Sequence, residues 1–337
     1  MQEKKSLIGL NPAELKEIML SLNMPAFAAK QITEWLYKRR VHSIDEMTNI
    51  SSKNRELLKE KFEIGRNEPI FAQTSADGTK KYLFKTPKGH FVESVFIPEY
   101  ERFTLCVSSQ AGCKMACKFC MTGKQGFGGQ LSASEIMNQI MSVPEADKLT
   151  NLVFMGMGEP FDNTQELLRA LEILTSDYGY AWSPKRITVS SIGIIPEMKV
   201  FLEKSACHLA ISMNSPFAKE REELMPMEKT YPLQEVIGIL RQYDFTKQRR
   251  LSFEYIMFEG LNDTVRHAVE VVKLLKGLEC RVNLIRFHAI PDTDLRTSDE
   301  QKMVAFRDYL TNNGIICTIR RSRGEDISAA CGMLQAP

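Results

Sequence analysis

The chain has 337 residues, of which 43% are hydrophobic and 26% are charged, as is typical of a globular protein and not of a disordered one. The length suits one large α/β domain and a smaller one. The formal net charge of +2 neither requires nor excludes a nucleic-acid partner, because binding proteins can concentrate charge on one face. We find no signal-peptide core and no apolar run of about 18 residues. We therefore expect a cytoplasmic protein without membrane association, whose eight cysteines stay reduced.

Two small segments precede the main domain. Three helical patterns open the chain and predict a small helical domain over residues 1–68; they cover 12–22, 25–40 and 52–62. Residues 69–98 then alternate apolar and polar side chains, and the dipeptides Asp77-Gly78 and Lys88-Gly89 mark turns. This segment is expected to be a short antiparallel β section that links the helical domain to the rest.

From residue 99 onward, strands and helices alternate up to the C-terminal tail. The predicted strands are 104–109, 151–157, 186–192, 207–213, 251–258 and 280–288. The predicted helices are 132–142, 164–177, 196–204, 233–243, 262–276 and 299–313. Six consecutive βα units predict a parallel sheet, open or curled into a partial barrel, in a core domain over 99–331. A short further strand, 315–321, leads into a tail that we expect to be flexible. Chemistry in such folds sits at the carboxyl ends of the strands.

Three cysteines follow the first of these strands with the spacing C-x3-C-x2-C. Cys113, Cys117 and Cys120 can hold one corner of an iron–sulfur cubane and leave the fourth iron open for a substrate. The alternative is a structural zinc site, which needs four ligands, with Cys106 as the fourth. Either way, the grouping of the thiols indicates a metal centre on the loop.

Small or polar residues end the next strands and are candidates for binding a cofactor. Each also has an ordinary interpretation: the glycine and glutamate as a turn with a helix-capping role, the residues of the third and fourth strand ends as strand caps, and the histidine as a structural or solvated residue. These residues are Gly158 and Glu159 after the second strand, Ser190 at the end of the third, Ser212, Met213 and Asn214 at the end of the fourth, and His288 at the end of the sixth.

The cysteine loop resembles that of the radical S-adenosylmethionine superfamily. Phe119 just before the last cysteine, and Gly156-Met-Gly-Glu-Pro160 after the second strand, fit the same pattern. The resemblance implies a partial (β/α)6 barrel with one [4Fe-4S] cluster per chain, held by the three cysteines. The open iron binds S-adenosylmethionine, and an electron from the cluster cleaves it reductively. The resemblance also implies that Glu159 holds the amino group of the methionine part.

Further motifs resemble one family within that superfamily. They are Leu105-Cys-Val-Ser-Ser-Gln-Ala-Gly-Cys113, Val282-Asn-Leu-Ile285 and Arg323-Gly-Glu-Asp-Ile-Ser-Ala-Ala-Cys-Gly332. Together they are similar to the adenine-C2 methyltransferases of 23S ribosomal RNA and transfer RNA, the RlmN type, and to their relatives of the Cfr type. The resemblance runs from the N-terminal helices to residue 334. Two positions depart from it, since many members carry asparagine in place of His288 and histidine in place of Asn214.

Roles for individual residues follow from this resemblance. Cys331 becomes S-methylated, Cys106 forms a transient disulfide with it, and Glu93 accepts a proton. Two S-adenosylmethionine molecules are consumed per turnover, one to methylate Cys331 and one to activate its methyl group. The cofactor contacts implied are Gly158, Glu159, Ser190, Ser212, the main chain of Met213, Asn214 and His288. Such a route suits the target, because carbon 2 of adenine is electron-poor and attacks no sulfonium methyl, whereas a thiolate does.

The family resemblance also implies partners. They are 23S ribosomal RNA and transfer RNA, together with an electron donor such as flavodoxin, and the chain is expected to be a monomer. A base must leave its stack to reach a buried centre. Candidate phosphate contacts are Lys38, Arg39, Arg40, Lys118, Lys124, Arg320, Arg321 and Arg323. Tyr37 is a candidate stacking platform, whereas we interpret Trp35 as a core residue.

Three other functions stay open from the sequence. The first is Cfr-like methylation at carbon 8 of the same ribosomal adenosine, with the same cysteines. The second is a different radical enzyme, such as an activase or a thiotransferase. The third is a zinc-containing RNA-binding protein without catalysis. Cys207, Cys280 and Cys317 fall in predicted strands and are interpreted as core thiols in every case.

Overall fold

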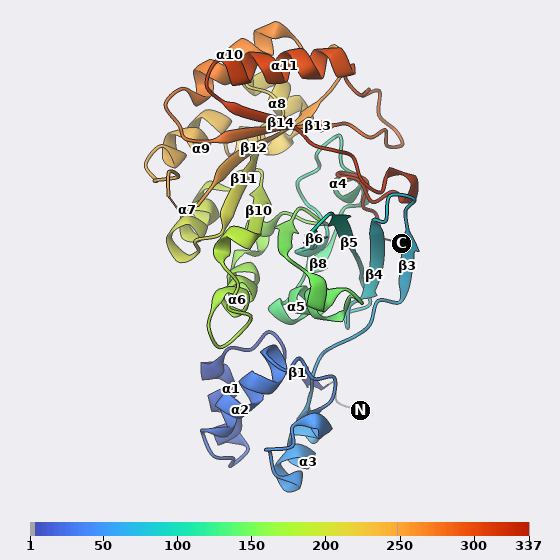
Figure 1. Cartoon of the computed structure of the whole chain (residues 1–337), viewed down its shortest axis with the longest axis vertical. Coiled ribbons are helices and arrows are strands. Elements are labelled where there is room, and N and C mark those ends of the chain that lie inside the picture. Colours follow the sequence, from blue (N-terminus) through green and yellow to red (C-terminus); the bar gives the residue numbers. More distant parts are fainter. Residues whose placement is uncertain (1–3, 248, 337) are drawn as a thin grey trace.

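The centre of the molecule is one large mixed sheet. The computed structural model describes residues 4–247 and 249–336, so residues 1–3 of the expected helical domain lie outside it. Within the described residues the sheet has ten strands in the order β14-β13-β12-β11-β10-β9-β6-β5-β4-β3 (Figure 1). In this sheet, β6 and the strands β9 to β14 are parallel, as the βα alternation predicts.

The parallel strands form where the sequence predicts them. They are β6 (Arg102–Cys106), β9 (Asn151–Phe154), β10 (Ile187–Ser191), β11 (His208–Ser212), β12 (Leu251–Met257), β13 (Arg281–Arg286) and β14 (Ile316–Ile319). All seven residues of β12 are buried, which is characteristic of a central parallel strand covered on both faces. The strand predicted at 315–321 is confirmed as the shorter β14, which pairs parallel with β13 and extends the sheet.

Helices connect the parallel strands. They are α5 (Ala133–Ser142), α6 (Thr164–Thr175), α7 (Ile195–Lys204), α9 (Leu233–Leu240), α10 (Val265–Leu275) and α11 (Glu300–Asn312). Capping groups set several of their starts: Ser132 and Glu135 form a capping box on α5, and the Asp299 carboxylate accepts from the first turn of α11. Two short helices in loops escaped prediction, α4 (Met121–Gln125) and α8 (Ala218–Leu224). No helix among the described residues is long and apolar enough to span a membrane.

The antiparallel strands continue the same sheet. They are β3 (Phe71–Thr74), β4 (Lys80–Lys85) and β5 (Phe91–Glu99). β5 pairs antiparallel with β6, and Val95 lies opposite Cys106. An unbroken hydrogen-bonded ladder therefore joins the expected segment 69–98 to the core and brings Glu93 onto the strand beside Cys106.

The N-terminal part contains the expected helices and one small sheet. The helices are α1 (Pro12–Ser21), α2 (Ala28–Tyr37) and α3 (Ser52–Lys61). A parallel pair, β1 (Lys5–Ser6) and β2 (Phe62–Glu63), ties the two ends of this part together. Trp35 is buried, as predicted. The interpretation of Tyr37 as a stacking platform is wrong, because its ring is buried and its hydroxyl donates to the carbonyl of Leu10 at 2.6 Å.

The N-terminal part packs against the core through a close backbone contact. Gly9, with φ +88°, passes so near the start of α5 that an added Cβ would lie 2.5 Å from the amide nitrogen of Ser134. An ion pair of 2.5 Å between Glu14 and Arg169 of α6 lies beside it. Figure 1 shows the N-terminal helices below the core, under the end that carries α5 and α6.

Gly9→Ala should loosen this contact. The substitution forces a non-glycine residue to φ +88° and drives its Cβ into the α5 backbone, so we expect a loss of about 3 kcal/mol in the free energy of unfolding. Gly89→Ala is the matched control, because Gly89 has φ +84° but open space around its Cβ, and should cost only about 1 kcal/mol. Urea unfolding of both variants measures the difference, and equal losses would contradict the contact.

The stability of the core should depend on pH through His208 at the start of β11. Burial, followed by nearby cations, lowers the pKa of His208 from 6.5 to about 4, and its Nδ1 accepts from the amide of Arg250 at 2.9 Å. Because the unfolded chain takes up the proton first, this stability is complete above pH 6.5 and is lost as the pH falls toward 4. Between pH 7.5 and 5 the native protein should lose about 2 kcal/mol more than His208→Asn in urea unfolding. Parallel pH profiles would contradict this.

Candidate active site

The loop that carries the three cysteines is fastened at several points. It runs between two short strands, β7 (Gln110–Gly112) and β8 (Phe127–Gln130), which pair antiparallel. The amide of Cys113 donates to the carbonyl of Gly126 at 2.8 Å, and that of Lys118 donates to the carbonyl of Leu224 in α8 at 3.0 Å. The loop is therefore held by its own hairpin on one side and by α8 on the other.

The three thiols lie close enough to influence one another. Burial raises the pKa of Cys117 well above its usual range, and the neighbouring Cys120 and Cys113 raise it further. Among the described residues, no three His, Cys, Asp or Glu side chains converge on the position of a single metal ion. A cubane does not require such convergence, because each thiolate binds a different iron. Three thiolates on one fastened, half-buried loop fit a [4Fe-4S] cluster.

Gly158 allows the loop after β9 to approach this hairpin. Its φ is +97°, and an added Cβ would lie 2.5 Å from the Cβ of Gln110. The side chain of Gln110 in turn accepts from the amide of Glu159 at 2.8 Å. The glycine is therefore needed at this position for the packing of the two loops, whichever group binds there.

Glu159 joins the end of β9 to the end of β10. Its two carboxylate oxygens accept from the amides of Phe161 at 3.0 Å and Ile192 at 3.1 Å. Burial raises its pKa to about 7, although these hydrogen bonds oppose the shift. The capping role considered from the sequence is thus present. The hydroxyl of Ser191 also donates to this carboxylate. A carboxylate has about four acceptor positions, so Glu159 can still accept from an ammonium group.

The ends of β10 and β11 carry the next candidates, Ser190, Ser212, Met213 and Asn214. Ser190 and Ser212 are half-buried, whereas Met213 and Asn214 are buried. Asn214 has φ +54°, and its side-chain oxygen accepts from the amide of Ile256 at 2.9 Å. Its side chain therefore shapes the junction between the β11 and β12 ends, while Ser190 and Ser212 line the same edge of the sheet.

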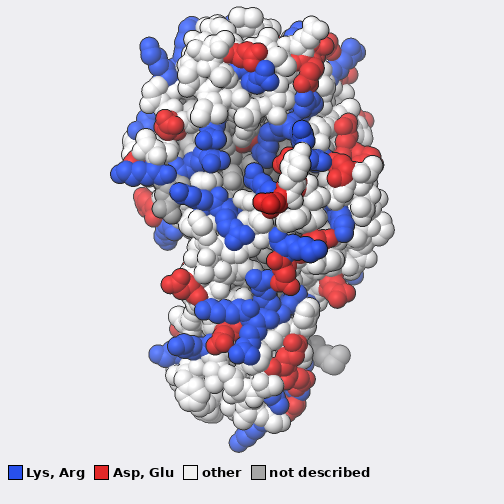
Figure 2. Space-filling model, in the orientation of Figure 1, with Lys and Arg blue, Asp and Glu red and all other residues white. Residues whose placement is uncertain are grey.

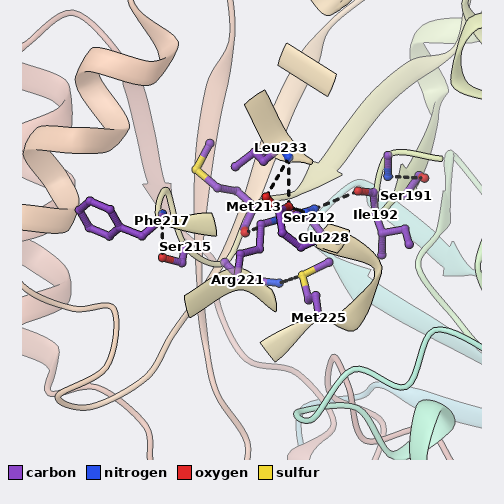
Figure 3. Close-up of polar contacts among 12 residues, drawn as sticks. Ser191, Ile192, Ser212, Met213, Ser215, Phe217, Arg221, Met225, Glu228 and Leu233 are labelled. Atoms are coloured by element: carbon purple, nitrogen blue, oxygen red, sulfur yellow. Dashed lines mark hydrogen bonds and ion pairs between the residues drawn. The ribbon is translucent and has the colours of Figure 1, made fainter. Parts of the chain in front are cut away.

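Sequence reasoning missed a buried arginine beneath these strand ends. Arg221 of α8 is 1% exposed and donates to the carbonyls of Ile192 at 3.0 Å, Ser212 at 2.9 Å and Met213 at 3.1 Å (Figure 3). It also forms an ion pair with Glu228. Burial lowers the pKa of Arg221, and the charges of Glu228 and Cys117 oppose that shift, which indicates how near the guanidinium lies to the cysteine loop. A lone arginine in a polar segment gives no signal in the sequence that could have revealed it.

His288 lies at the other side of the site. It is 6% exposed, and its Nδ1 lies 3.4 Å from a carboxylate oxygen of Glu325 in the tail. A row of aromatic rings connects the cysteine loop to the ends of β12 and β13: the ring centroid of Phe119 lies 5.7 Å from that of Phe258, which lies 5.1 Å from that of Phe287. The contact that the structure gives His288 is thus with the C-terminal tail.

The tail returns to the cysteine loop and is fastened there, contrary to the expectation of a flexible tip. The amide of Met121 donates to the carbonyl of Gly332 at 2.8 Å, and the hydroxyl of Thr122 to that of Leu334 at 2.8 Å. Farther back, the carboxylate of Asp326 accepts from the hydroxyl of Ser75 at 2.6 Å. The residue next to Cys331 is therefore bound to the residue next to Cys120.

The returning tail brings the thiol of Cys331 near that of Cys106. Burial raises the pKa of Cys106 to about 12, and the next largest cause is the thiol of Cys331. Burial of its thiol group likewise raises the pKa of Cys331 to about 11, although the residue as a whole is exposed; Arg320 opposes the shift and Cys120 adds to it. The structure thus brings together the two cysteines that the sequence singled out, beside the cysteine loop.

Glu93 also contacts the tail. Its carboxylate forms an ion pair of 3.0 Å with Lys81 of β4 and accepts from the amide of Gln335 at 2.9 Å. Burial raises its pKa, while Lys81 opposes the shift. Lys81 is a second functional candidate that the sequence did not reveal. Nothing in the sequence of β4 marks Lys81 as the partner of Glu93, which lies on the next strand.

Known proteins resemble this chain along its whole length. Residues 5–64 match the family model of the ribosomal RNA large subunit methyltransferase N-terminal domain, and residues 107–275 match that of the radical SAM superfamily. A probable dual-specificity RNA methyltransferase RlmN from Phocaeicola vulgatus is 62% identical over 98% of this chain and 95% of its own length. The dual-specificity RNA methyltransferase RlmN from Marinobacter nauticus is 40% identical over 98% and 93%.

A solved structure agrees with these relatives. The radical SAM methyltransferase from Sphaerobacter thermophilus superposes with a TM-score of 0.92 at 35% identity, and the match covers 98% of each chain. The arrangement of cysteine loop, strand ends and returning tail therefore belongs to a known type of enzyme. The chain is a member of the RlmN family of radical S-adenosylmethionine RNA methyltransferases.

Proposed function

We propose that this enzyme methylates carbon 2 of an adenosine in 23S ribosomal RNA and in transfer RNA, with Cys331 as the residue that carries the methyl group. The observation that supports this most directly is the hydrogen bonding of the tail to the cysteine loop at Met121 and Thr122, which brings Cys331 near Cys106. A relay through a protein thiol needs two cysteines besides the cluster ligands, and the fold supplies these two at one place.

Cys113, Cys117 and Cys120 would hold the [4Fe-4S] cluster. When bound, the cluster supplies the electron that cleaves S-adenosylmethionine, and S-adenosylmethionine supplies the methyl group. The ends of β9, β10 and β11 would seat the cofactor: Gly158 gives the backbone room, the Glu159 carboxylate accepts from the amino group, and Ser190, Ser212, Met213 and Asn214 line the edge. His288 would contact the adenosine part.

Two groups would complete the reaction on the protein side. Cys106 would attack the sulfur of Cys331 to release the product, which leaves a disulfide that an external thiol reduces again. Glu93 would accept the proton lost from the adenine carbon. Its raised pKa suits a base that must hold a proton, and Lys81 keeps the carboxylate available before the transfer.

The RNA would lie on a basic face. Figure 2 shows Lys and Arg side chains spread over both the N-terminal part and the core on this face, with acidic side chains gathered at one edge of the N-terminal part. Lys38 and Arg321 are exposed and suit phosphate contacts. Arg39 is exposed as well, but it pairs with Glu34 at 3.4 Å and lies over the ring of Trp35. Other candidates already have partners, since Arg40 pairs with Asp147, Arg323 with Asp77 and Arg320 with Glu254. We propose further that an electron donor such as flavodoxin serves a monomeric enzyme that uses two cofactor molecules per turnover.

Mild oxidation of the iron-free protein should link Cys106 to Cys331. Two thiols that already act on each other have a high effective concentration, so their disulfide should form ahead of any other. Peptide mapping without reductant measures the linkage. Cys207 and Cys317 are buried in the core and should remain free thiols, as an internal control. A predominant Cys120–Cys331 linkage would contradict the proposed pairing.

The central experiment uses S-adenosylmethionine with a deuterated methyl group under anaerobic conditions. Label should appear on Cys331 before it appears in RNA, and the RNA product should be 2-methyladenosine by mass spectrometry. Cys331→Ala should abolish RNA methylation while the iron content stays at the native level, and Cys317→Ala should change neither. Formation of 8-methyladenosine would favour the Cfr-type reaction. Label in RNA without label on Cys331 would contradict the proposed transfer of the methyl group through this cysteine.

A further inference from the structure

Arg221 is the most deeply buried charged side chain near the site, at 1% exposure. Such a charge is costly to bury unless each of its hydrogens finds an acceptor. Its acceptors here are not scattered: three are main-chain carbonyls at the carboxyl ends of β10 and β11, and the fourth partner is the Glu228 carboxylate. The guanidinium thus bridges two neighbouring strand ends, and Figure 3 shows these contacts as dashed lines.

Glu228 holds the arginine in turn. Its carboxylate, 5% exposed, also accepts from the amide of Leu233 at 3.0 Å, at the first residue of α9. The guanidinium is therefore fixed from one side by a carboxylate anchored on a helix end. A planar group held in this way can fix the spacing of three carbonyls, which a flexible ammonium group cannot.

The helix that carries Arg221 also touches the cysteine loop. The carbonyl of Leu224 accepts from the amide of Lys118, between Cys117 and Cys120, at 3.0 Å. The sulfur of Met225 accepts from the side-chain amide of Asn214 at 3.1 Å. Residues 221–225 therefore contact the strand ends on one side and the cysteine loop on the other.

We propose that Arg221 is a positioning residue, which Glu228 orients, and that it sets the seat of S-adenosylmethionine at the ends of β10 and β11 in register with the cluster loop. The inference rests on the proposed cofactor seat. Arg221 donates through its side chain to the backbone of Ser212 and Met213 and would not contact the cofactor itself. Substitution of Arg221 should therefore lower the affinity for S-adenosylmethionine in a protein that still folds and binds its cluster.

The test compares Arg221→Lys with Arg249→Lys. Arg249 also bridges two carbonyls, those of Leu202 at 3.0 Å and Cys207 at 3.2 Å, but it does so at the amino ends of the strands. Both variants are reconstituted anaerobically and compared for thermal unfolding, iron content, the dissociation constant of S-adenosylmethionine by equilibrium dialysis, and the change that this cofactor causes in the paramagnetic resonance spectrum of the reduced cluster.

Arg221→Lys should keep its iron but bind S-adenosylmethionine at least about tenfold more weakly, the effect of losing one charge-assisted hydrogen bond. It should also show an altered cofactor-induced spectrum, whereas Arg249→Lys should lie within about twofold of the native affinity at a similar loss of thermal stability. Equal affinities for the two variants would overturn the proposal. If Arg221→Lys does not reconstitute, Glu228→Gln replaces it; loss of iron in both would also overturn the proposal, because α8 would then serve the cluster loop alone.

Ser190→Ala and Ser212→Ala separate this inference from the seat on which it rests. If they weaken binding of S-adenosylmethionine and Arg221→Lys does not, only the role of Arg221 fails. If all three bind the cofactor as the native protein does, the seat itself is misplaced.

Discussion

A line of buried hydrogen bonds runs along the carboxyl edge of the parallel sheet, and the rest of the site depends on it. The amide of Glu159 donates to the side chain of Gln110, and the carboxylate of Glu159 accepts from the amide of Ile192. The carbonyl of Ile192 then accepts from Arg221. Arg221 also donates to the carbonyls of Ser212 and Met213. The next residue, Asn214, accepts from the amide of Ile256. Because buried polar groups must be paired, each strand end is fixed by its neighbour.

The antiparallel strands extend the sheet on the side of β6 and contribute residues to the site. β5 extends the sheet beyond β6, so Glu93 lies on the strand next to Cys106 and faces the returning tail. The tail then contacts the cysteine loop through Met121 and Thr122. Cys106 and Cys331 are more than two hundred positions apart in the chain. They come near each other because the tail is hydrogen-bonded both to Glu93 of β5 and to the cysteine loop.

The sequence predicted much of this arrangement for identifiable physical reasons. Long apolar runs and amphipathic patterns predicted the βα units, and three cysteines within eight residues predicted the metal-binding loop. Both are local patterns, which can be recognised from residues close together in the chain. The β1–β2 pair escaped because two-residue strands have no period to detect. Tyr37 was misjudged because the sequence does not distinguish an exposed tyrosine at a helix end from one whose ring is buried and whose hydroxyl donates to a carbonyl, here that of Leu10.

Arg221 and Lys81 escaped for a different reason. Each acquires its role from partners on other elements, Ile192 and Met213 in one case and Glu93 in the other, and no spacing along the chain encodes those contacts. The family resemblance could assign roles to Glu93 and Cys331 because those residues lie in recognisable motifs. It was silent on the side chains that hold such residues in place.

The burial of the Arg221–Glu228 pair is difficult to explain by stability alone. Two hydrophobic side chains of similar volume often stabilise a protein as well as a buried ion pair does, because the pair must first be removed from water. Hydrophobic side chains, however, would leave the carbonyls of Ile192, Ser212 and Met213 to be satisfied by water. Water in that place would not hold the three carbonyls at a fixed spacing, as a planar guanidinium does. An arginine supplies the same donors in a fixed and dry form, so the pair is better explained by the demands of the site than by those of the fold.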